Sequence, residues 1–287
     1  MTITRFAPSP TGYLHLGHAF AAFTARQAGD HFLVRIEDID AVRCRPHFEA
    51  AILDDLKWLG LAFEEPVLRQ SSRHNAYRAA IDRLKARGLV YPCICTRKDI
   101  ADEIARSVEA PHGPDGPVYP GTCRQLDENE RAQKITSGAP YALRLDAAKA
   151  AQEAGALFFE EHGVGPGGEA GRIAVQPLLF GDVVLARKEM PAAYHLAVVI
   201  DDAFQGVTLV TRGNDLFAST HVQRLLQALL GLPTPVYAHH PLILDETGKK
   251  FSKRDHAVTL RTLRERGVTV QEIRDRVYSA ASMMSRR

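Results

Sequence analysis

The sequence has few cysteines, no long apolar run and no excess of charge of either sign. Four cysteines in 287 residues do not make the disulfide framework of a small secreted domain. Residues 1–5 do not begin a signal peptide, and no apolar stretch approaches the roughly 20 residues of a membrane span. With 36 basic against 34 acidic residues, the formal charge of +2 excludes a polycation that holds nucleic acid by overall charge. We therefore expect a soluble, cytoplasmic protein without a membrane partner.

The chain is 45% hydrophobic and long enough for about two domains. Apolar periodicity near its start predicts alternating strands and helices. The expected elements are strands at Thr2–Phe6 and His31–Asp38 and helices at Leu16–Ala28, 46–59 and 71–87. Such a β-α-β start predicts an α/β fold with a doubly wound parallel sheet.

After Leu89 this alternation breaks, because cysteines, a Pro/Gly-rich stretch at 111–117 and a Gly-rich loop at Gly163–Gly171 interrupt it. We expect four parts in chain order: a first half of the catalytic core at 1–90, an inserted subdomain at 91–190, a second half of the core at 191–235, and a loop with short helical segments at 236–287. The sequence assigns no role to the Gly163–Gly171 loop or to Cys44.

The first motif with chemical meaning runs from Arg5 to His18 and reads RFAPSPTGYLHLGH. It lies on a turn from strand to helix, where ligands bind in open α/β sheets and helix amides face an anion. The imidazoles of His15 and His18 can donate to phosphate oxygens, and Gly12 and Gly17 allow a planar base to approach the backbone. Two surface histidines in a turn are the alternative for the last four residues alone; the whole string favours a nucleotide site.

The second motif is Lys249–Arg254 (KKFSKR), which follows Gly248. A glycine-led loop with several cations and a hydroxyl suits the charge that develops on a departing pyrophosphate. An isolated charge run is more often a solvated surface. Paired with the first motif, it predicts that Lys250 and Lys253 act on the leaving group.

These two strings resemble the HIGH and KMSKS motifs of class I aminoacyl-tRNA synthetases. Other segments, in the same order as in the glutamyl-tRNA synthetase catalytic core, extend the resemblance over residues 1 to about 256: Arg5–Gly12, Arg35–Asp40, Gly181–Leu185, Tyr194–Asp202 and Thr211–Asp215. The resemblance implies a Rossmann-like core that activates glutamate with ATP and Mg²⁺. Leu16, Phe251 and Arg254 stand where the family motifs have isoleucine, methionine and serine.

The resemblance also implies which residues contact the substrates. The implied glutamate site comprises Arg5, Phe6, Ala7, Pro8, Ser9, Glu37, Tyr194 and Arg212, and the implied ATP site Gly12, His15, Gly17, His18 and Lys253. Arginine is a two-pronged donor that suits a side-chain carboxylate and that glutamine would satisfy poorly, so Arg5 and Arg212 are sensible selectors. Glu37 suits the substrate ammonium. Solvated charge is the alternative for Glu37, and core packing is the alternative for Tyr194.

A third group combines Cys93-Ile-Cys95 with Cys123. Zinc takes four ligands in a tetrahedron, and three cysteines supply three of them. By residue type, His112 or Asp115 would be the fourth ligand. The resemblance to short glutamyl-Q tRNA(Asp) synthetases implies Tyr119 instead. Three reduced cysteines without a metal are the alternative.

Only residues 255–287 follow Arg254, whereas a glutamyl-tRNA synthetase that reads the anticodon carries a further helical domain there. The family members without that domain attach activated glutamate to the queuosine base in the anticodon loop of tRNA(Asp). We therefore expect ATP, L-glutamate and queuosine-containing tRNA(Asp) as partners of a monomeric ligase. The alternatives are a truncated synthetase that charges tRNA(Glu), a non-catalytic tRNA-binding paralogue, and a small-molecule adenylyltransferase.

Overall fold

The computed structural model describes residues 1–106, 112–243 and 258–284. The helices are α1 (Leu16–Ala28), α2 (Pro46–Trp58), α3 (His74–Ala86), α4 (Arg97–Arg106), α5 (Glu128–Thr136), α6 (Ala147–Ala154), α7 (Tyr194–Phe204), α8 (Ser219–Leu230), α9 (Leu260–Glu265) and α10 (Val270–Met284). The strands are β1 (Ile3–Phe6), β2 (His31–Ile36), β3 (Glu64–Arg69), β4 (Val90–Cys93), β5 (His112–Gly113), β6 (Gly116–Pro117), β7 (Ala142–Leu145), β8 (Phe158–Glu161), β9 (Gly171–Ala174), β10 (Val184–Arg187), β11 (Leu209–Gly213) and β12 (Val236–His240).

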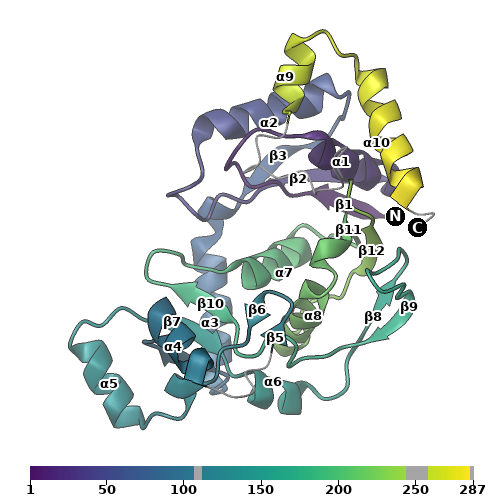
Figure 1. Cartoon of the computed structure of the whole chain (residues 1–287). Coiled ribbons are helices and arrows are strands. Elements are labelled where there is room, and N and C mark those ends of the chain that lie inside the picture. Colours follow the sequence, from purple (N-terminus) through teal and green to yellow (C-terminus); the bar gives the residue numbers. More distant parts are fainter. Residues whose placement is uncertain (107–111, 244–257, 285–287) are drawn as a thin grey trace.

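Two groups of parallel strands form the centre of the molecule (Figure 1). One group has the order β1-β2-β3, and the other has β11 and β12 with β8 beside them. The groups meet where the Thr208 amide donates to the Ile3 carbonyl, 3.0 Å away. The parallel α/β arrangement agrees with the sequence prediction, although the ladder is divided between two sheets rather than being one.

Strand β3 was not expected from the sequence. It reads EEPVLR and is mostly exposed, and its proline lacks the N–H that an interior strand would donate. The strand lies at the edge of its sheet, paired only with β2. A charged, proline-containing edge strand has no apolar alternation, so periodicity does not reveal it.

The helix expected at 71–87 begins later than predicted. Its first turn is a 3₁₀ helix, Gln70–Arg73, and α3 starts at His74. The Ser71 amide and hydroxyl both donate to the carboxylate of Asp38, at 2.8 and 2.6 Å. This anchor ties the 3₁₀ turn to the end of β2, beside the central pocket.

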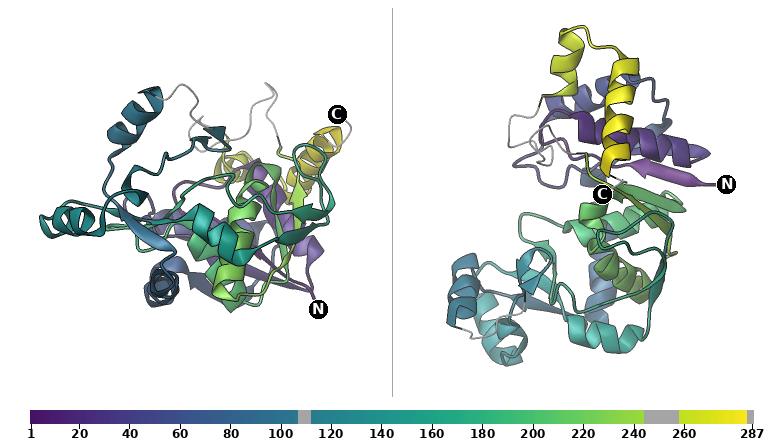
Figure 2. Two further views of the ribbon diagram at one scale, coloured as in Figure 1. Left: turned by 90° about the horizontal axis from the view of Figure 1, so that it is seen from below. Right: turned by 45° about the vertical axis from the view of Figure 1, so that its right-hand side comes forward.

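An antiparallel sheet of order β10-β7-β4 lies at the opposite end of the molecule from α9 and α10 (Figures 1 and 2). Helices α4 and α5 and the small hairpin β5–β6 lie between β4 and β7 in the chain. Strands β8 and β9 also fall between residues 91 and 190, but β8 pairs with β12. The expected boundaries of an inserted subdomain at 91 and 190 remain a proposal.

Two large apolar clusters support the pocket from opposite sides. One joins α1 and α2 to the C-terminal helices, through residues such as Phe23, Ile52, Leu260 and Val277. The other joins α3, α6, α7 and α8. Among the helices that the structure describes, none combines the length and apolar character needed to cross a membrane.

Candidate active site

A pocket of about 360 Å³ opens at the carboxyl ends of β1, β2 and β11. Its lining is Arg5, Phe6, Ala7, Pro8, Ser9, Thr11, His18, Ala21, Glu37, Tyr194, Thr211, Arg212 and Leu216. All eight residues expected at a glutamate site are therefore brought together, although they come from segments up to two hundred residues apart. Thr11, Ala21, Thr211 and Leu216 were not expected, because small and apolar lining residues carry no chemical signature in a sequence.

We call Arg5, Arg35, Glu37 and Asp202 the first wall of this pocket. Arg5 Nε and Arg35 Nη1 both donate to Asp202 Oδ1, at 3.1 and 2.7 Å, and Arg5 also donates to the Thr211 carbonyl. Burial alone would raise the pKa of Asp202, but the two guanidinium groups outweigh it and hold that pKa below its usual range. Asp202 is thus an ionised carboxylate that orients Arg5.

Glu37 follows β2 and lines the pocket beside Arg5. Its amide donates to the Pro8 carbonyl at 3.0 Å, which ties it to the first motif, and Arg35 Nη2 lies 3.5 Å from its carboxylate. Burial raises the pKa of Glu37 above its usual range, while Arg35 and Arg5 act in the opposite direction. A bound ammonium would favour the ionised form.

We call Tyr194, Arg212, Thr220, Gln223 and His239 the second wall. Arg212 is 6% exposed and donates to four groups: Thr220 Oγ1 at 2.7 Å, Gln223 Oε1 at 2.8 Å, His239 Nε2 at 3.0 Å and Tyr194 Oη at 3.4 Å. None of these partners, in the part of the chain that the structure describes, is a carboxylate. The guanidinium is therefore held in place by neutral groups.

The bond from Arg212 fixes the protonation of His239. Because Nε2 accepts from Arg212, the ring proton must be on Nδ1, which lies 2.5 Å from Glu161 Oε2. Glu161 Oε1 accepts from the amides of His239 and Gly163, both at 2.8 Å. Burial lowers the pKa of His239, Glu161 opposes this, and Arg212 adds to it. Glu161 and His239 thus form a buried relay that sets the direction of Arg212.

The sequence did not reveal this relay, but the relay explains why the Gly163–Gly171 loop begins with a glycine. A Cβ at position 163 would lie 2.1 Å from the His239 carbonyl oxygen and 2.9 Å from Glu161 Oε1. Only glycine allows the two strands and the carboxylate to approach this closely. In the sequence, Glu161 is an acidic residue at an inward-facing strand position, a weak signal without a known partner.

The first motif forms the turn into α1. His15 precedes that helix, its amide donates to His18 Nδ1 at 3.3 Å, and the two ring centroids are 3.8 Å apart. Gly17 is in the first turn of α1, where a Cβ would lie 3.1 Å from the ring of His15, and Gly12 is in the preceding loop. The two imidazoles are therefore held together at the pocket, with His18 in its lining.

The second motif, with Lys250 and Lys253, lies outside the described residues. Thr259 and Leu260, where the described chain resumes, do contact the first motif. Thr259 forms a bridge with His15, and the Leu260 amide donates to the Leu14 carbonyl at 2.8 Å. The chain thus returns to the histidine motif immediately after the lysine motif.

The three cysteines singled out in the sequence lie together. The sulfur atoms of Cys93, Cys95 and Cys123 are all within 4.8 Å of one another, and Cys95 and Cys123 are 3.3 Å apart. Tyr119 Oη lies 3.4 Å from Cys93 Sγ and 3.5 Å from Cys95 Sγ. Thiolates bound to one tetrahedral zinc, at about 2.3 Å each, lie roughly 3.8 Å apart. Three sulfurs and one oxygen at these spacings fit a zinc ion, whereas Asp115 is not among the residues whose ligand atoms gather at the cluster.

The fold and the pocket define a class I aminoacyl-tRNA synthetase catalytic domain. The family model described as "tRNA synthetases class I (E and Q), catalytic domain" matches residues 1–279. A glutamyl-Q tRNA(Asp) synthetase of Rhodobacter capsulatus is 53% identical over 95% of this chain and 98% of its own length. One of Nocardia farcinica is 45% identical, over 94% and 81%.

Among solved structures, the chain is similar to a glutamate tRNA ligase of Elizabethkingia meningosepticum in complex with its amino acid, with a TM-score of 0.69 and 29% identity. The match covers 88% of this chain and 52% of that one, so the chain spans about half of the solved ligase. The chain belongs to the class I tRNA synthetases for glutamate and glutamine, and within them to the glutamyl-Q tRNA(Asp) synthetases. This agrees with the resemblance in the sequence.

Proposed function

We propose that this chain activates L-glutamate with ATP and transfers the glutamyl group to the queuosine base of tRNA(Asp). The observation that carries the choice of amino acid is the buried Arg212, held by neutral groups at a pocket of amino-acid size. The choice of acceptor rests on the names of the relatives that match nearly the full length of both chains.

In the proposed complex the γ-carboxylate of glutamate binds Arg212, with Arg5 as the second cation. The substrate ammonium lies at Glu37, and Tyr194 covers the aliphatic part. Phe6, Ala7, Pro8 and Ser9 complete the wall beside Arg5. A two-pronged guanidinium prefers a carboxylate to the amide of glutamine, which offers one oxygen and an opposing N–H₂ group.

The first chemical step joins glutamate to AMP. An α-carboxylate oxygen attacks the α-phosphorus of ATP, the bond to the bridging oxygen breaks, and pyrophosphate leaves. His15 and His18 would donate to the phosphates near Gly12 and Gly17, and Lys250 and Lys253 would act on the leaving pyrophosphate. Mg²⁺, which accompanies ATP in this class, would screen the triphosphate charge. Positioning and electrostatic stabilisation supply most of the rate.

In the second step a hydroxyl oxygen of the cyclopentene diol of queuosine attacks the carbonyl carbon of the adenylate. The carbon–oxygen bond to the phosphate breaks, AMP leaves, and the hydroxyl proton is lost. The rival acceptor is the 3′ end of tRNA(Glu), since a glutamate–tRNA ligase of Aquifex aeolicus is 39% identical over 92% of this chain.

The deciding experiment is transfer of labelled glutamate to two purified RNAs: queuosine-containing tRNA(Asp), with and without mild periodate treatment, and tRNA(Glu). Label on tRNA(Asp) alone, abolished by periodate oxidation of the diol, is the expected result. Label on tRNA(Glu) would make the chain a minimal glutamyl-tRNA synthetase. No pyrophosphate exchange with glutamate would favour a non-catalytic paralogue.

We also propose that Cys93, Cys95, Tyr119 and Cys123 hold one structural zinc ion. The metal content of the purified protein tests this directly. One zinc per chain is expected, with loss of most of it in Cys123→Ser and none in the matched control Cys44→Ser, whose sulfur lies near the Glu37 carbonyl instead. Equal zinc in both variants would refute the ligand set.

A further inference from the structure

A second pocket, of about 310 Å³, adjoins the amino-acid pocket. Consecutive residues of α7 line the two pockets: Tyr194 lines the amino-acid pocket and His195 lines the second pocket. The ring centroids of Tyr194 and His195 are 5.4 Å apart. A group bound in the second pocket would therefore lie next to a carboxyl activated in the first.

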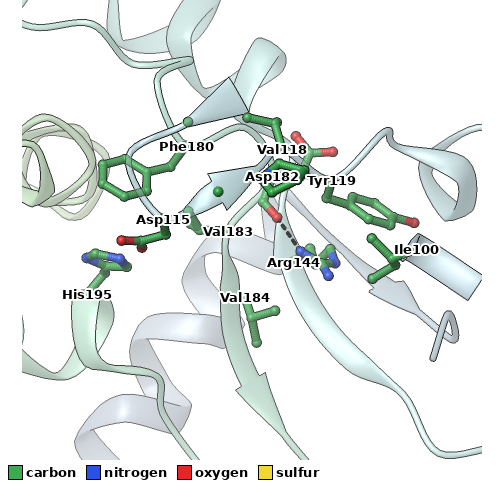
Figure 3. A pocket seen from close by; sticks show the side chains of 13 residues that line it. Ile100, Asp115, Val118, Tyr119, Arg144, Phe180, Asp182, Val183, Val184 and His195 are labelled. Carbon is green, nitrogen blue, oxygen red and sulfur yellow. Dashed lines mark hydrogen bonds between the residues drawn. The ribbon is translucent and has the colours of Figure 1, made fainter. Parts of the chain in front are cut away.

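The walls of the second pocket are mostly apolar and partly aromatic. They come from α4, the β5–β6 hairpin, the segment before β10 and α7, and include Ile100, Val118, Phe180, Val183 and Val184. The Phe180 and His195 ring centroids are 5.5 Å apart, and Figure 3 shows both side chains at the same end of the pocket as Asp115. Such a slot suits a flat ring, because single-stranded bases are commonly held against aromatic side chains.

Few polar groups in this pocket are left for a ligand. Arg144 is partly engaged, since its Nη1 donates to the Asp182 carbonyl at 2.7 Å and its guanidinium lies over the Tyr119 ring, while its buried Nε has no hydrogen-bond partner among the described residues. Asp115, at the tip of the hairpin, is exposed, and buried His195 Nδ1 has no hydrogen-bond partner in the described part of the chain. Burial and the charge of Arg212 lower the pKa of His195 to about 4, so its ring is neutral near pH 7. The pocket thus offers a carboxylate at its rim, a neutral ring inside and the Nε–H of Arg144 in its wall.

We infer that this second pocket receives the guanine-type base of the acceptor nucleotide, with its ring against Phe180 and His195 and its Watson–Crick edge at Asp115. A guanine-type edge carries adjacent N1–H and N2–H₂ donors, which two carboxylate oxygens can accept together. Adenine and cytosine present a ring nitrogen acceptor at that place, uracil has one donor, and a phosphate would be repelled by the carboxylate. Queuosine keeps the guanine edge because its substituent is on the five-membered ring. The inference rests on the proposed function and names how its acceptor is recognised.

The test separates activation from transfer in the full-length protein. Pyrophosphate exchange with ATP and glutamate and glutamyl transfer to queuosine-containing tRNA(Asp) are measured for Phe180→Leu and Asp115→Asn. Asp54→Asn, an exposed change on α2, is the matched control. We expect kcat/KM for transfer to fall roughly 10-fold or more in the two pocket variants, which is the size of one charge-assisted hydrogen bond or one base stack. The rate of pyrophosphate exchange should stay within about 3-fold of wild type in all three variants. The contacts to the base are made only in the transfer step, so activation does not depend on them.

Transfer at the wild-type rate in both pocket variants would overturn the inference while leaving the proposed function standing. Absence of any transfer to tRNA(Asp) by the wild-type protein would overturn the proposed function itself. A competition assay with free nucleosides gives a second readout. Selective inhibition of transfer by 7-deazaguanosine over 7-deazaadenosine supports recognition of the guanine edge, and equal inhibition by both overturns it.

Discussion

The two walls of the amino-acid pocket hold their arginines by different means. In the first wall, Arg5 and Arg35 share the carboxylate of Asp202, so buried positive charge is balanced within the protein. In the second wall, Arg212 is held by a threonine, a glutamine, a tyrosine and a neutral histidine. The first arrangement is an ion-pair network, and the second is a cage of neutral acceptors.

The difference indicates which arginine meets the substrate carboxylate. A buried charge without a counter-charge is costly, and a ligand that supplies the counter-charge removes that cost. Arg5 already has Asp202, whereas Arg212 has no carboxylate among its described partners. We therefore assign the γ-carboxylate mainly to Arg212, and the following changes test the two walls in order of expected effect.

The largest effect is expected on stability, from Asp202→Asn in the first wall. The substitution keeps the shape of the side chain but removes the carboxylate that both guanidinium groups contact, leaving Glu37 and Asp201 as nearby charges. Loss of one member of a buried ion-pair network costs about 3–5 kcal/mol. Urea unfolding followed by circular dichroism measures it.

The control is Asp54→Asn on the exposed face of α2, for which a change within about 0.5 kcal/mol is expected. An unfolding midpoint for Asp202→Asn equal to that of the control would mean that the first wall is not held together by charge.

A smaller effect, on substrate binding, is expected for Arg212→Gln in the second wall. The free energy of glutamate binding should weaken by about 2–4 kcal/mol, so the KM for glutamate rises roughly 30- to 1000-fold while the KM for ATP changes little. Unlike Asp202→Asn, this change removes a buried charge that has no carboxylate in direct contact, so the urea midpoint should move less. Pyrophosphate exchange at varied glutamate and ATP gives both constants.

Arg224→Gln, on α8 with its side chain bonded to the Phe158 carbonyl, serves as the matched control and should leave both constants unchanged. Equal increases in the two KM values for Arg212→Gln would contradict its role as the glutamate selector.

The sequence predicted the first wall and the second wall unequally. The strand-turn-helix motif and helix α1 were predicted almost to the residue, because the apolar periodicity is regular and Gly29 ends the helix. Arg5, Glu37, Tyr194 and Arg212 carried recognisable motifs. Glu161 and His239 could not be predicted, because their partnership depends on the pairing of β8 with β12, seventy-odd residues apart. Local patterns do not specify such long-range pairings.

A moderate effect is expected for Glu161→Gln, which breaks the relay behind Arg212. If the new N–H₂ group faces His239 Nδ1, the ring proton moves to Nε2 and meets the N–H of Arg212; if the amide is reversed, it meets the amides of His239 and Gly163. Either mismatch costs about 1–3 kcal/mol. The KM for glutamate should rise roughly 10-fold with kcat less affected, and Glu160→Gln on the same strand is the neighbouring control. Unchanged glutamate KM would show that Arg212 does not depend on the relay.

The smallest effect is a pH dependence of the second wall. Burial lowers the pKa of His239 below its ordinary value of about 6.5, so its neutral form stabilises the fold fully above that value. This contribution is lost as pH falls from 6.5 through the folded pKa, since the unfolded chain binds the proton more readily. Protonation would place Nε2–H against Arg212 Nε–H, so the KM for glutamate should rise as pH falls below about 6.5 and through the folded pKa, with a smaller change for ATP. Within the first wall, Asp202 should not respond there, because its pKa is held below its usual range near 4, whereas burial raises the pKa of Glu37, so protonation of Glu37 would add to the rise in the KM for glutamate. Parallel increases in both KM values would place the titrating group outside the second wall.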